Sequence, residues 1–303
     1  MRTAWLCGLA WVLALALAAG SAVADTRRGT IEHDGLQRSY LVHVPARYDA
    51  SRPVPLLIAL HGGGGHMAYQ ADDERYGLVS KAEREGFIVV FPNGYSRLPR
   101  GRLATWNAGD CCGASRDRGI DDLGFLRRLI ERVQGEFAID RERVFATGMS
   151  NGAMMAHRLA CELPHTVRAI AAVAGTDNTR RCDPAQPVSV LMIHARNDDH
   201  VAFGGGRGPK AFGDATTEFT SVPETLERWK RRNRCDGPPR RVLERPGAQC
   251  ELWSGCADGS RVQLCMTDDG GHSWPGGRKD RAAEAPSQAL SANDVMWDFF
   301  MRR

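Results

Sequence analysis

The residues Gly148-Met149-Ser150-Asn151-Gly152 place a serine between two glycines, and the segments on either side restrict what this stretch can form. The preceding run, residues 143–147, is rich in β-branched and aromatic residues and predicts a buried strand. The following run, residues 153–160, is rich in good helix formers. A strand, a tight turn that carries serine and a helix together predict a nucleophile elbow, in which the helix N-terminus lies beside the serine oxygen.

Strand-like and helix-like runs alternate along the rest of the chain. Continuous apolar runs at residues 55–60, 86–91, 167–174 and 188–193 predict strands buried on both faces. Residues 40–44 alternate like an antiparallel edge strand, and residues 261–266 predict the last strand. Helices are expected from about residue 120 to 133, 223 to 232 and 292 to 300. This alternation predicts an α/β fold with a mostly parallel sheet and helices on both faces.

The N-terminus has the pattern of a secretory signal peptide. Arg2 precedes an apolar run at residues 4–19, and Ala22 and Ala24 form an A-x-A cleavage site. We therefore expect residues 1–24 to be removed near Ala24, leaving residues 25–303 as one domain that is extracellular or periplasmic. The apolar run is short for a membrane span, so no stable membrane anchor is expected. The net charge of +4 is too small to indicate a nucleic-acid partner.

Cysteine usage indicates a fold braced by disulfides. Of nine cysteines, Cys7 lies in the apolar run, and an even number remains for the exported chain. These are Cys111, Cys112, Cys161, Cys182, Cys235, Cys250, Cys256 and Cys265. No C-x-x-C pair is present, which makes metal binding the weaker interpretation. Eight cysteines allow 105 pairings, but Cys250 and Cys265 flank a predicted hairpin and could face each other across it.

A serine hydroxyl needs a base, and the base needs an orienting carboxylate. In the α/β-hydrolase fold these groups follow in the order Ser, acid, His, each after a strand. After Ser150, the strand that ends at residue 193 leads to the adjacent acids Asp198 and Asp199. The last strand leads through a glycine turn to His272, which we take as the base. Either acid could orient it on this reasoning.

The glycine-rich run after the strand at residues 55–60 suggests an oxyanion hole. His61 is followed by four glycines, and the backbone N–H of Gly63 is expected to point at the substrate carbonyl. The second donor would be the N–H of Asn151. His61 and His66 raise a metal pair as an alternative, but no carboxylate or cysteine accompanies them, so neither metal nor cofactor is expected.

Several motifs together resemble the secreted α/β-hydrolase esterases of the polyhydroxybutyrate depolymerase and feruloyl esterase type. They are residues 60–65 (LHGGGG), 105–113 (TWNAGDCCG), 121–126 (DDLGFL), 148–152 (GMSNG), 270–277 (GGHSWPGG) and 297–300 (WDFF). The resemblance implies Ser150 as nucleophile, Asp198 as acid and His272 as base, with Asp199 facing solvent.

The resemblance also implies that Trp106 and Trp274 are walls of the substrate cleft. One departure is that the acid loop begins His194-Ala195-Arg196, where the family usually has His-Gly-Thr.

These features predict a secreted serine carboxylic-ester hydrolase that forms an acyl-enzyme. Feruloyl-type esters and polyhydroxyalkanoate esters such as hydroxybutyrates both fit, as small-molecule, oligomeric or polymeric substrates. Two alternatives stay open: an acyltransferase that uses the same acyl-enzyme, and a catalytically silent binding protein with the hydrolase fold. The oligomeric state cannot be read from the sequence.

Overall fold

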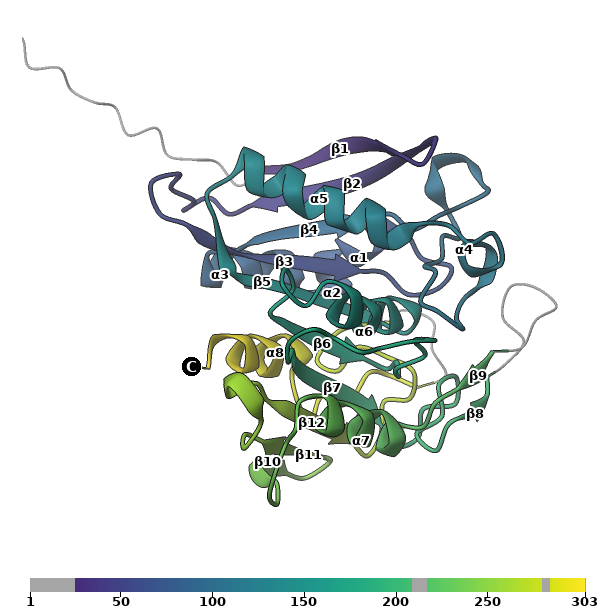
Figure 1. Cartoon of the computed structure of the whole chain (residues 1–303), viewed down its shortest axis with the longest axis vertical. Coiled ribbons are helices and arrows are strands. Elements are labelled where there is room, and N and C mark those ends of the chain that lie inside the picture. The colour runs from purple at the N-terminus through teal and green to yellow at the C-terminus, as the bar shows by residue number, and fades with distance from the viewer. Residues whose placement is uncertain (1–24, 209–216, 280–283, 303) are drawn as a thin grey trace, which may run out of the picture.

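The structure, a computed structural model, describes residues 25–208, 217–279 and 284–302. A ten-stranded sheet runs through them in the order β1-β2-β4-β3-β5-β6-β7-β12-β11-β10 (Figure 1). The strands from β4 to β12 in this order are parallel, and the strands outside them at both ends are antiparallel. The signal peptide expected at residues 1–24 lies outside the described residues.

The strand bounds of this sheet are β1 Asp25–His33, β2 Leu36–Val44, β3 Val54–Leu60, β4 Ile88–Pro92, β5 Ile139–Met149, β6 Ala169–Val173, β7 Ser189–Ala195, β10 Arg240–Arg245, β11 Ala248–Trp253 and β12 Val262–Thr267. A separate two-stranded sheet pairs β8 (Gly206–Arg207) with β9 (Glu218–Phe219). The helices are α1 Met67–Gln70, α2 Asp73–Tyr76, α3 Leu78–Glu85, α4 Gly113–Asp117, α5 Asp122–Glu136, α6 Asn151–Glu162, α7 Val222–Arg232 and α8 Ala292–Met301.

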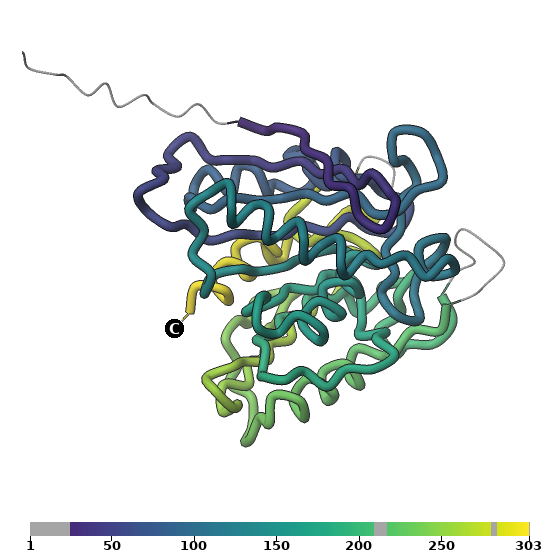
Figure 2. Tube along the Cα trace, turned by 45° about the horizontal axis from the view of Figure 1, so that its top comes forward, coloured from purple at the N-terminus to yellow at the C-terminus, as the bar shows by residue number. Residues whose placement is uncertain are grey.

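Helices cover both faces of the sheet, as predicted for an α/β-hydrolase fold. Figures 1 and 2 show α5, α6 and α7 on the near face, with α8 behind the sheet. Alternate residues of β3 serve two cores: Leu56 and Ile58 pack on the side of α5 and α6, and Leu57 and Ala59 on the side of α3 and α8. Each fully buried Leu or Ile stabilises the fold by about 1.5–3 kcal/mol.

The prediction of an edge strand at residues 40–44 was wrong in one respect. Residues 40–44 belong to β2, but β1 pairs with β2 in register from Asp25↔Val44 to His33↔Leu36 and forms the edge itself. The sequence of β1, DTRRGTIEH, is largely polar and exposed, so it carries no apolar pattern to find. Charged residues on an edge strand discourage pairing with other chains, and the opposite edge, β10, has the same character with the sequence RRVLER.

The cysteines after residue 25 form disulfides, as expected. The bridges are Cys111–Cys112, Cys161–Cys182, Cys235–Cys256 and Cys250–Cys265. The predicted facing pair, Cys250 and Cys265, is confirmed by the β11–β12 register, in which these two residues are direct partners. Among the helices that the structure describes, none has the length and apolar character needed to cross a bilayer.

Candidate active site

Ser150 lies in the sharp turn between β5 and α6, with backbone φ 57° and ψ −123°. This left-handed φ is uncommon for a residue other than glycine. A Cβ atom on Gly148 would lie 2.5 Å from the backbone of Gly152, and one on Gly152 would lie 2.3 Å from the carbonyl oxygen of Leu60. The turn is held by the Ser150 N–H, which donates to the Val173 carbonyl at 2.9 Å. The two glycines of the motif are thus required because the helix and the neighbouring strand approach so closely.

His272 and Asp198 meet beyond the carboxyl ends of the adjacent strands β12 and β7. Nδ1 of His272 lies 2.9 Å from Oδ2 and 3.1 Å from Oδ1 of Asp198. The Asp198 side chain is fully buried, whereas His272 lines a cavity that Ser150 also lines. When Nδ1 donates its hydrogen to the carboxylate, Nε2 is left as an acceptor for a proton.

The environment of Asp198 favours its ionised form. Backbone N–H groups of His200 and Val201 donate to its Oδ1, each at 2.9 Å. Burial alone raises the pKa of this carboxyl, but the hydrogen bond and charge of His272, the charge of His194 and the Val201 amide outweigh burial and hold the pKa below its ordinary value. The carboxylate therefore remains available to hold the imidazole.

The neighbouring pair Asp199 and His200 was not anticipated as part of this site. Asp199 faces solvent, as the resemblance implied, and its carboxylate lies 2.6 Å from Nδ1 of His200. This hydrogen bond is the main reason that the pKa of Asp199 is lowered. The His200 ring in turn stacks on the His272 ring. His200 belongs to none of the sequence motifs, so its place beside His272 could be recognised only from the folded loop.

A further contact joins the acid loop to the histidine loop, because the side-chain oxygen of Asn197 accepts the Gly271 N–H at 3.0 Å. Within the histidine loop, the Ser273 hydroxyl donates to the Gly270 carbonyl at 2.6 Å. Arg196, where the chain departs from the family, is about half exposed, and its Nε lies 3.4 Å from the Asp268 carboxylate.

The glycine-rich loop after β3 is anchored by His61. Nδ1 of His61 donates to the Gly62 carbonyl at 2.8 Å, and Nε2 accepts the Gly94 N–H at 2.9 Å. Complete burial lowers the pKa of His61 to about 4, so the ring is neutral and both nitrogens are engaged within the protein. A Cβ on Gly63 would lie 3.6 Å from the Asn151 Cβ, which places this loop against the start of α6. Gly63 and Asn151, whose N–H groups are the expected oxyanion donors, line the same cavity as Ser150.

The expectation that Trp106 forms a wall of the cleft is not met. Trp106 is completely buried, and its Nε1 donates to the His61 carbonyl at 2.9 Å. Its backbone N–H and C=O pair with the Asn151 side-chain amide at 2.7 and 3.0 Å. A tryptophan with an anchored N–H serves here as a support behind the oxyanion loop and the helix start. The motif TWNAG alone could not distinguish this position from a surface one.

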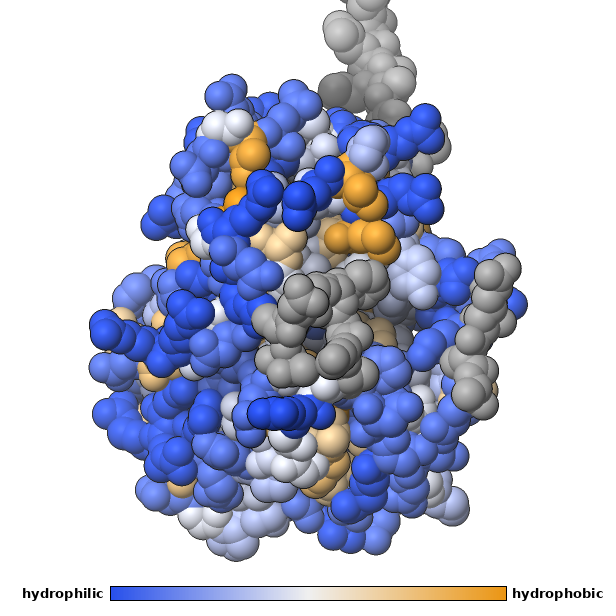
Figure 3. All heavy atoms as spheres, turned by 90° about the vertical axis from the view of Figure 1, so that its right-hand side faces the viewer, coloured by the Kyte–Doolittle hydropathy of each residue, from blue (hydrophilic) through white to orange (hydrophobic). Residues whose placement is uncertain are grey.

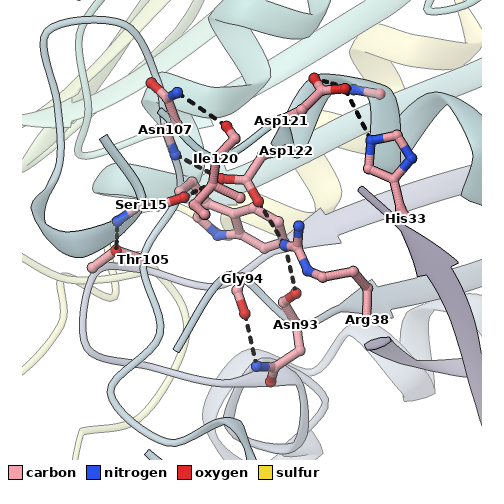
Figure 4. A network of polar contacts seen from close by, with 12 residues as sticks. His33, Arg38, Asn93, Gly94, Thr105, Asn107, Ser115, Ile120, Asp121 and Asp122 are labelled. Carbon is pink, nitrogen blue, oxygen red and sulfur yellow. Dashed lines mark hydrogen bonds and ion pairs between the residues drawn. The ribbon is translucent and has the colours of Figure 1, made fainter. Parts of the chain in front are cut away.

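A buried polar network behind the cleft was also missed (Figure 4). Asp122 accepts hydrogen bonds from the Arg38 guanidinium, the Ser115 hydroxyl and the Asn107 backbone N–H. Asp121 and Asp122 stand at the start of α5, where carboxylates ordinarily complement the helix dipole. Asp121 does cap the helix through the Gly124 N–H, but Asp122 is fully buried in an ion pair. Removing one partner of such a pair is strongly destabilising because the other charge stays buried.

Arg38 extends this network to the loops around the cavity. Its guanidinium donates to the Asn93 carbonyl at 3.2 Å, and the Asn93 side chain bonds the Met67 N–H and the Gly94 and Gly101 carbonyls. The network thus joins β2, the end of β4 and the start of α1, and the loops that these elements carry are fixed relative to one another (Figure 4).

The cavity at the carboxyl edge of the sheet has a volume of about 770 Å³. Trp274 lines this cavity, as expected, and its ring is the last of three aromatic rings that pack edge to face. The centroids of Tyr69 and Tyr76 are 5.8 Å apart, and those of Tyr76 and Trp274 are 5.5 Å apart. Figure 3 looks onto this side of the molecule, where hydrophilic residues cover most of the surface and a small group of apolar residues lies above the centre. The cavity is large enough for an aromatic acyl group.

Within the described segments, one group of side chains has the spacing of a metal site: Asp198, Asp199 and His200, whose ligand atoms lie within 4.8 Å of one another. The contacts already described account for this group. Asp198 is bound to His272, and Asp199 is bound to His200. Of the pair His61 and His66, the first has both ring nitrogens in hydrogen bonds, and Nδ1 of the second accepts the Tyr69 N–H at 3.2 Å.

Comparison with known proteins identifies the family. A family model described as esterase PHB depolymerase matches residues 38–204, more than half of the chain. The chain belongs to this family. It is therefore a carboxylic ester hydrolase with the α/β-hydrolase fold.

Relatives of this esterase include feruloyl esterase B of Piromyces equi, which is 28% identical over 80% of this chain. That match covers 44% of the relative, so the chain spans less than half of its length. Probable feruloyl esterase C of Aspergillus niger is 28% identical, over 87% of this chain and 84% of the relative. Among solved structures, the acetyl xylan esterase from Aspergillus awamori superposes with a TM-score of 0.60 at 15% identity, covering 90% of this chain and 98% of that one. This likeness shows the shared fold.

Proposed function

We propose that this esterase works through a Ser150–His272–Asp198 triad and a covalent acyl-enzyme. The observation that carries the proposal is the 2.9 Å contact between His272 Nδ1 and the buried Asp198 carboxylate, in a cavity that Ser150 shares. The strained backbone of Ser150 supports the same assignment, because an elbow presents the nucleophile clear of its helix.

The proposed reaction has two halves. Ser150 Oγ attacks the ester carbonyl while Nε2 of His272 takes the hydroxyl proton and then passes it to the departing alcohol. Water then attacks the acyl-enzyme, His272 takes its proton and returns it to Ser150, and the acid is released. Asp198 holds the tautomer and stabilises the imidazolium in both halves.

The backbone N–H groups of Gly63 and Asn151 are proposed to bind the oxyanion. Asn151 is the first residue of α6, so its N–H has no partner within the helix. The Asn151 side chain is hydrogen-bonded to the Trp106 backbone, so the Asn151 N–H is free to face the cavity. Removing one such donor typically costs about 3 kcal/mol of transition-state stabilisation.

For the substrate we propose feruloyl-type or hydroxybutyrate esters. The ring series of Tyr69, Tyr76 and Trp274 beside the cavity supports an ester that carries an aromatic group, and the relatives named as feruloyl esterases point the same way. We further propose that residues 25–303 form one catalytic domain, which is secreted after cleavage near Ala24.

A fluorophosphonate probe and a panel of esters test this function. The wild-type protein should be labelled at Ser150 and should hydrolyse methyl ferulate, p-nitrophenyl esters or hydroxybutyrate oligomers. Ser150→Ala should lose labelling and activity, by a factor on the order of 10⁶ as for the nucleophile of subtilisin. Activity that survives in Ser150→Ala would contradict the triad. Acyl transfer to added alcohol in preference to water would indicate a transferase.

A further inference from the structure

The cavity that holds Ser150 and His272 is lined by basic side chains and, among the residues described, by no acidic one. Arg102, Arg278 and Lys279 contribute positive charges to its wall. The whole chain is nearly balanced, with 40 Lys and Arg against 36 Asp and Glu. A surface with both signs interspersed is the ordinary result of such a composition, so this one-sided lining is a local feature of the cavity.

These cations also lack the carboxylate partners that many other arginines of the protein have. Arg158 and Arg228, for example, pair with glutamates one helical turn away. No contact with a carboxylate is found for Arg102, Arg278 or Lys279 in the described part of the chain. Lys279 instead donates from Nζ to the carbonyl of His272 at 3.0 Å. Within the described segments no side-chain hydrogen bond of Arg278 is found, so its guanidinium can donate to a ligand.

The turn that carries Arg278 is fixed at its base. The Gly277 N–H donates to the Trp274 carbonyl at 3.0 Å, and the Arg278 N–H donates to the Arg75 carbonyl at 3.0 Å. A Cβ on Gly277 would lie 2.4 Å from that same Arg75 oxygen, so only glycine allows this close packing. The side chain of Arg278 therefore starts from a defined point on the cavity wall.

The position of this turn specifies which part of a substrate it would meet. Arg278 and Lys279 follow His272 on the same loop, and Lys279 contacts the His272 backbone. In the proposed reaction His272 delivers its proton to the departing alcohol, so the loop lies on the alcohol side of the ester. Arg102 follows the helical turn Pro99–Gly101 and precedes Ala104 by two residues, and Ala104 pairs with Gly65 of the oxyanion loop.

We propose that Arg278, assisted by Lys279, binds a carboxylate on the alcohol portion of the ester substrate. This inference rests on the proposed function. A guanidinium can hold a carboxylate through two parallel hydrogen bonds, which fixes orientation as well as charge. Two kinds of substrate would supply this carboxylate: an oligomer of a hydroxy acid with a free carboxyl end, and a saccharide that carries a uronic acid.

Matched substrates test the proposal. The first pair is the linear dimer of 3-hydroxybutyrate as its free acid and as its terminal amide, which differ in charge but share the ester bond. The second pair is a feruloyl ester of glucuronic acid and one of glucose. We expect kcat/KM for the acid to exceed that for the neutral analogue about tenfold in at least one pair, as for a hydrogen bond between charged groups. The pair that shows the preference identifies the source, and the preference should shrink as salt is added.

Three variants locate the effect. Arg278→Gln should lower the ratio of the two kcat/KM values about tenfold, and Arg278→Glu should invert it and favour a substrate with a terminal ammonium group. Arg102→Gln removes the same charge from the oxyanion-loop side and should leave the ratio within about twofold, as for an exposed charge that makes no direct contact with the carboxylate. Inversion by Arg278→Glu cannot result from misfolding, since a loss of folded protein lowers both kcat/KM values by the same factor and leaves their ratio unchanged.

The outcomes separate this inference from the function on which it rests. A ratio near one for the wild-type protein in both pairs would overturn the carboxylate site. So would an equal fall of the ratio in Arg102→Gln and Arg278→Gln, because the preference would then reflect the general field of the cavity. Failure to hydrolyse the neutral and the acidic members alike, together with no fluorophosphonate labelling, would instead overturn the proposed triad.

Discussion

The imidazole rings of His200 and His272 lie parallel, with their centroids 4.9 Å apart and their planes 9° apart. Asp198 holds the Nδ1 edge of His272, and His200 covers one face of the same ring. Asp199 in turn binds His200 through Nδ1 at 2.6 Å. The orientation of His272 is therefore set by an edge contact and a face contact, both from the loop that follows β7.

Replacing His200 tests the face contact. His200→Ala should lower kcat by about three- to tenfold, because a stacked aromatic pair contributes about 0.5–1.5 kcal/mol beyond its buried area. His200→Phe keeps a ring at this place and should restore most of kcat. The comparison is made on kcat with a neutral ester across pH 6–9. Equal losses in the two variants would show that stacking is not what His200 provides.

The adjacent acids Asp198 and Asp199 should respond very differently to the same substitution. Asp198→Asn removes the charge that fixes the His272 tautomer, and we expect kcat/KM to fall about ten-thousand-fold, as in the serine protease case. Asp199→Asn changes an exposed residue whose side chain contacts His200 and no other side chain in the described part of the molecule, so the loss should stay under about tenfold. Steady-state kinetics of both variants measure this. A collapse in Asp199→Asn with Asp198→Asn near normal would reverse the two assignments.

The sequence predicted those parts of the candidate site that depend on local motifs. Ser150 and its glycines, the strand before them and the glycine loop at Gly63 each depend on short-range geometry that only certain residues allow. The pairing of Cys250 with Cys265 followed from one hairpin. The resemblance to known esterases then placed Asp198, which the residues alone did not distinguish from Asp199.

The parts that were missed depend on contacts between distant segments. Trp106 became a buried support because its backbone pairs with Asn151, 45 residues later. Asp122 reads as an ordinary acid in a first helical turn, but the fold brings Arg38 to it from β2. The contact between His200 and His272 exists only because the fold brings the loops after β7 and β12 together. Spacing along the chain cannot report such contacts.

The disulfides should contribute measurably to stability. Cys161–Cys182 and Cys235–Cys256 each join residues 21 positions apart. Closing a loop of about this length stabilises a protein by about 3 kcal/mol in the chain-entropy account. When the protein is produced with export and unfolded without reductant, it should show no more than a trace of free thiol, and adding reductant should lower Tm by several degrees. Titration of eight thiols per chain would contradict the bridges.

Two buried histidines should make the protein sensitive to acid. Burial lowers the pKa of His61 and of His157 to about 4 in the folded protein, below the ordinary value of 6.5. At a pH between the folded value of about 4 and the ordinary value of 6.5, the unfolded chain binds more protons than the folded one. The free energy of unfolding therefore increases as pH rises through this range and decreases as pH falls from 6.5 toward 4. Each histidine accounts for a loss of about 3 kcal/mol over that window.

His157 allows this loss to be measured away from the catalytic loops. Its Nδ1 accepts the Trp229 indole N–H at 2.9 Å, so His157→Gln can keep an acceptor there while removing the titrating ring. We expect urea unfolding to show a smaller fall in stability between pH 7 and pH 4.5 for His157→Gln than for the wild-type protein, even if the variant is less stable at pH 7. The exposed His165 provides the matched control, and His165→Gln should keep the wild-type pH dependence. If His157→Gln retained the full loss of stability in acid, the buried ring would not be its cause.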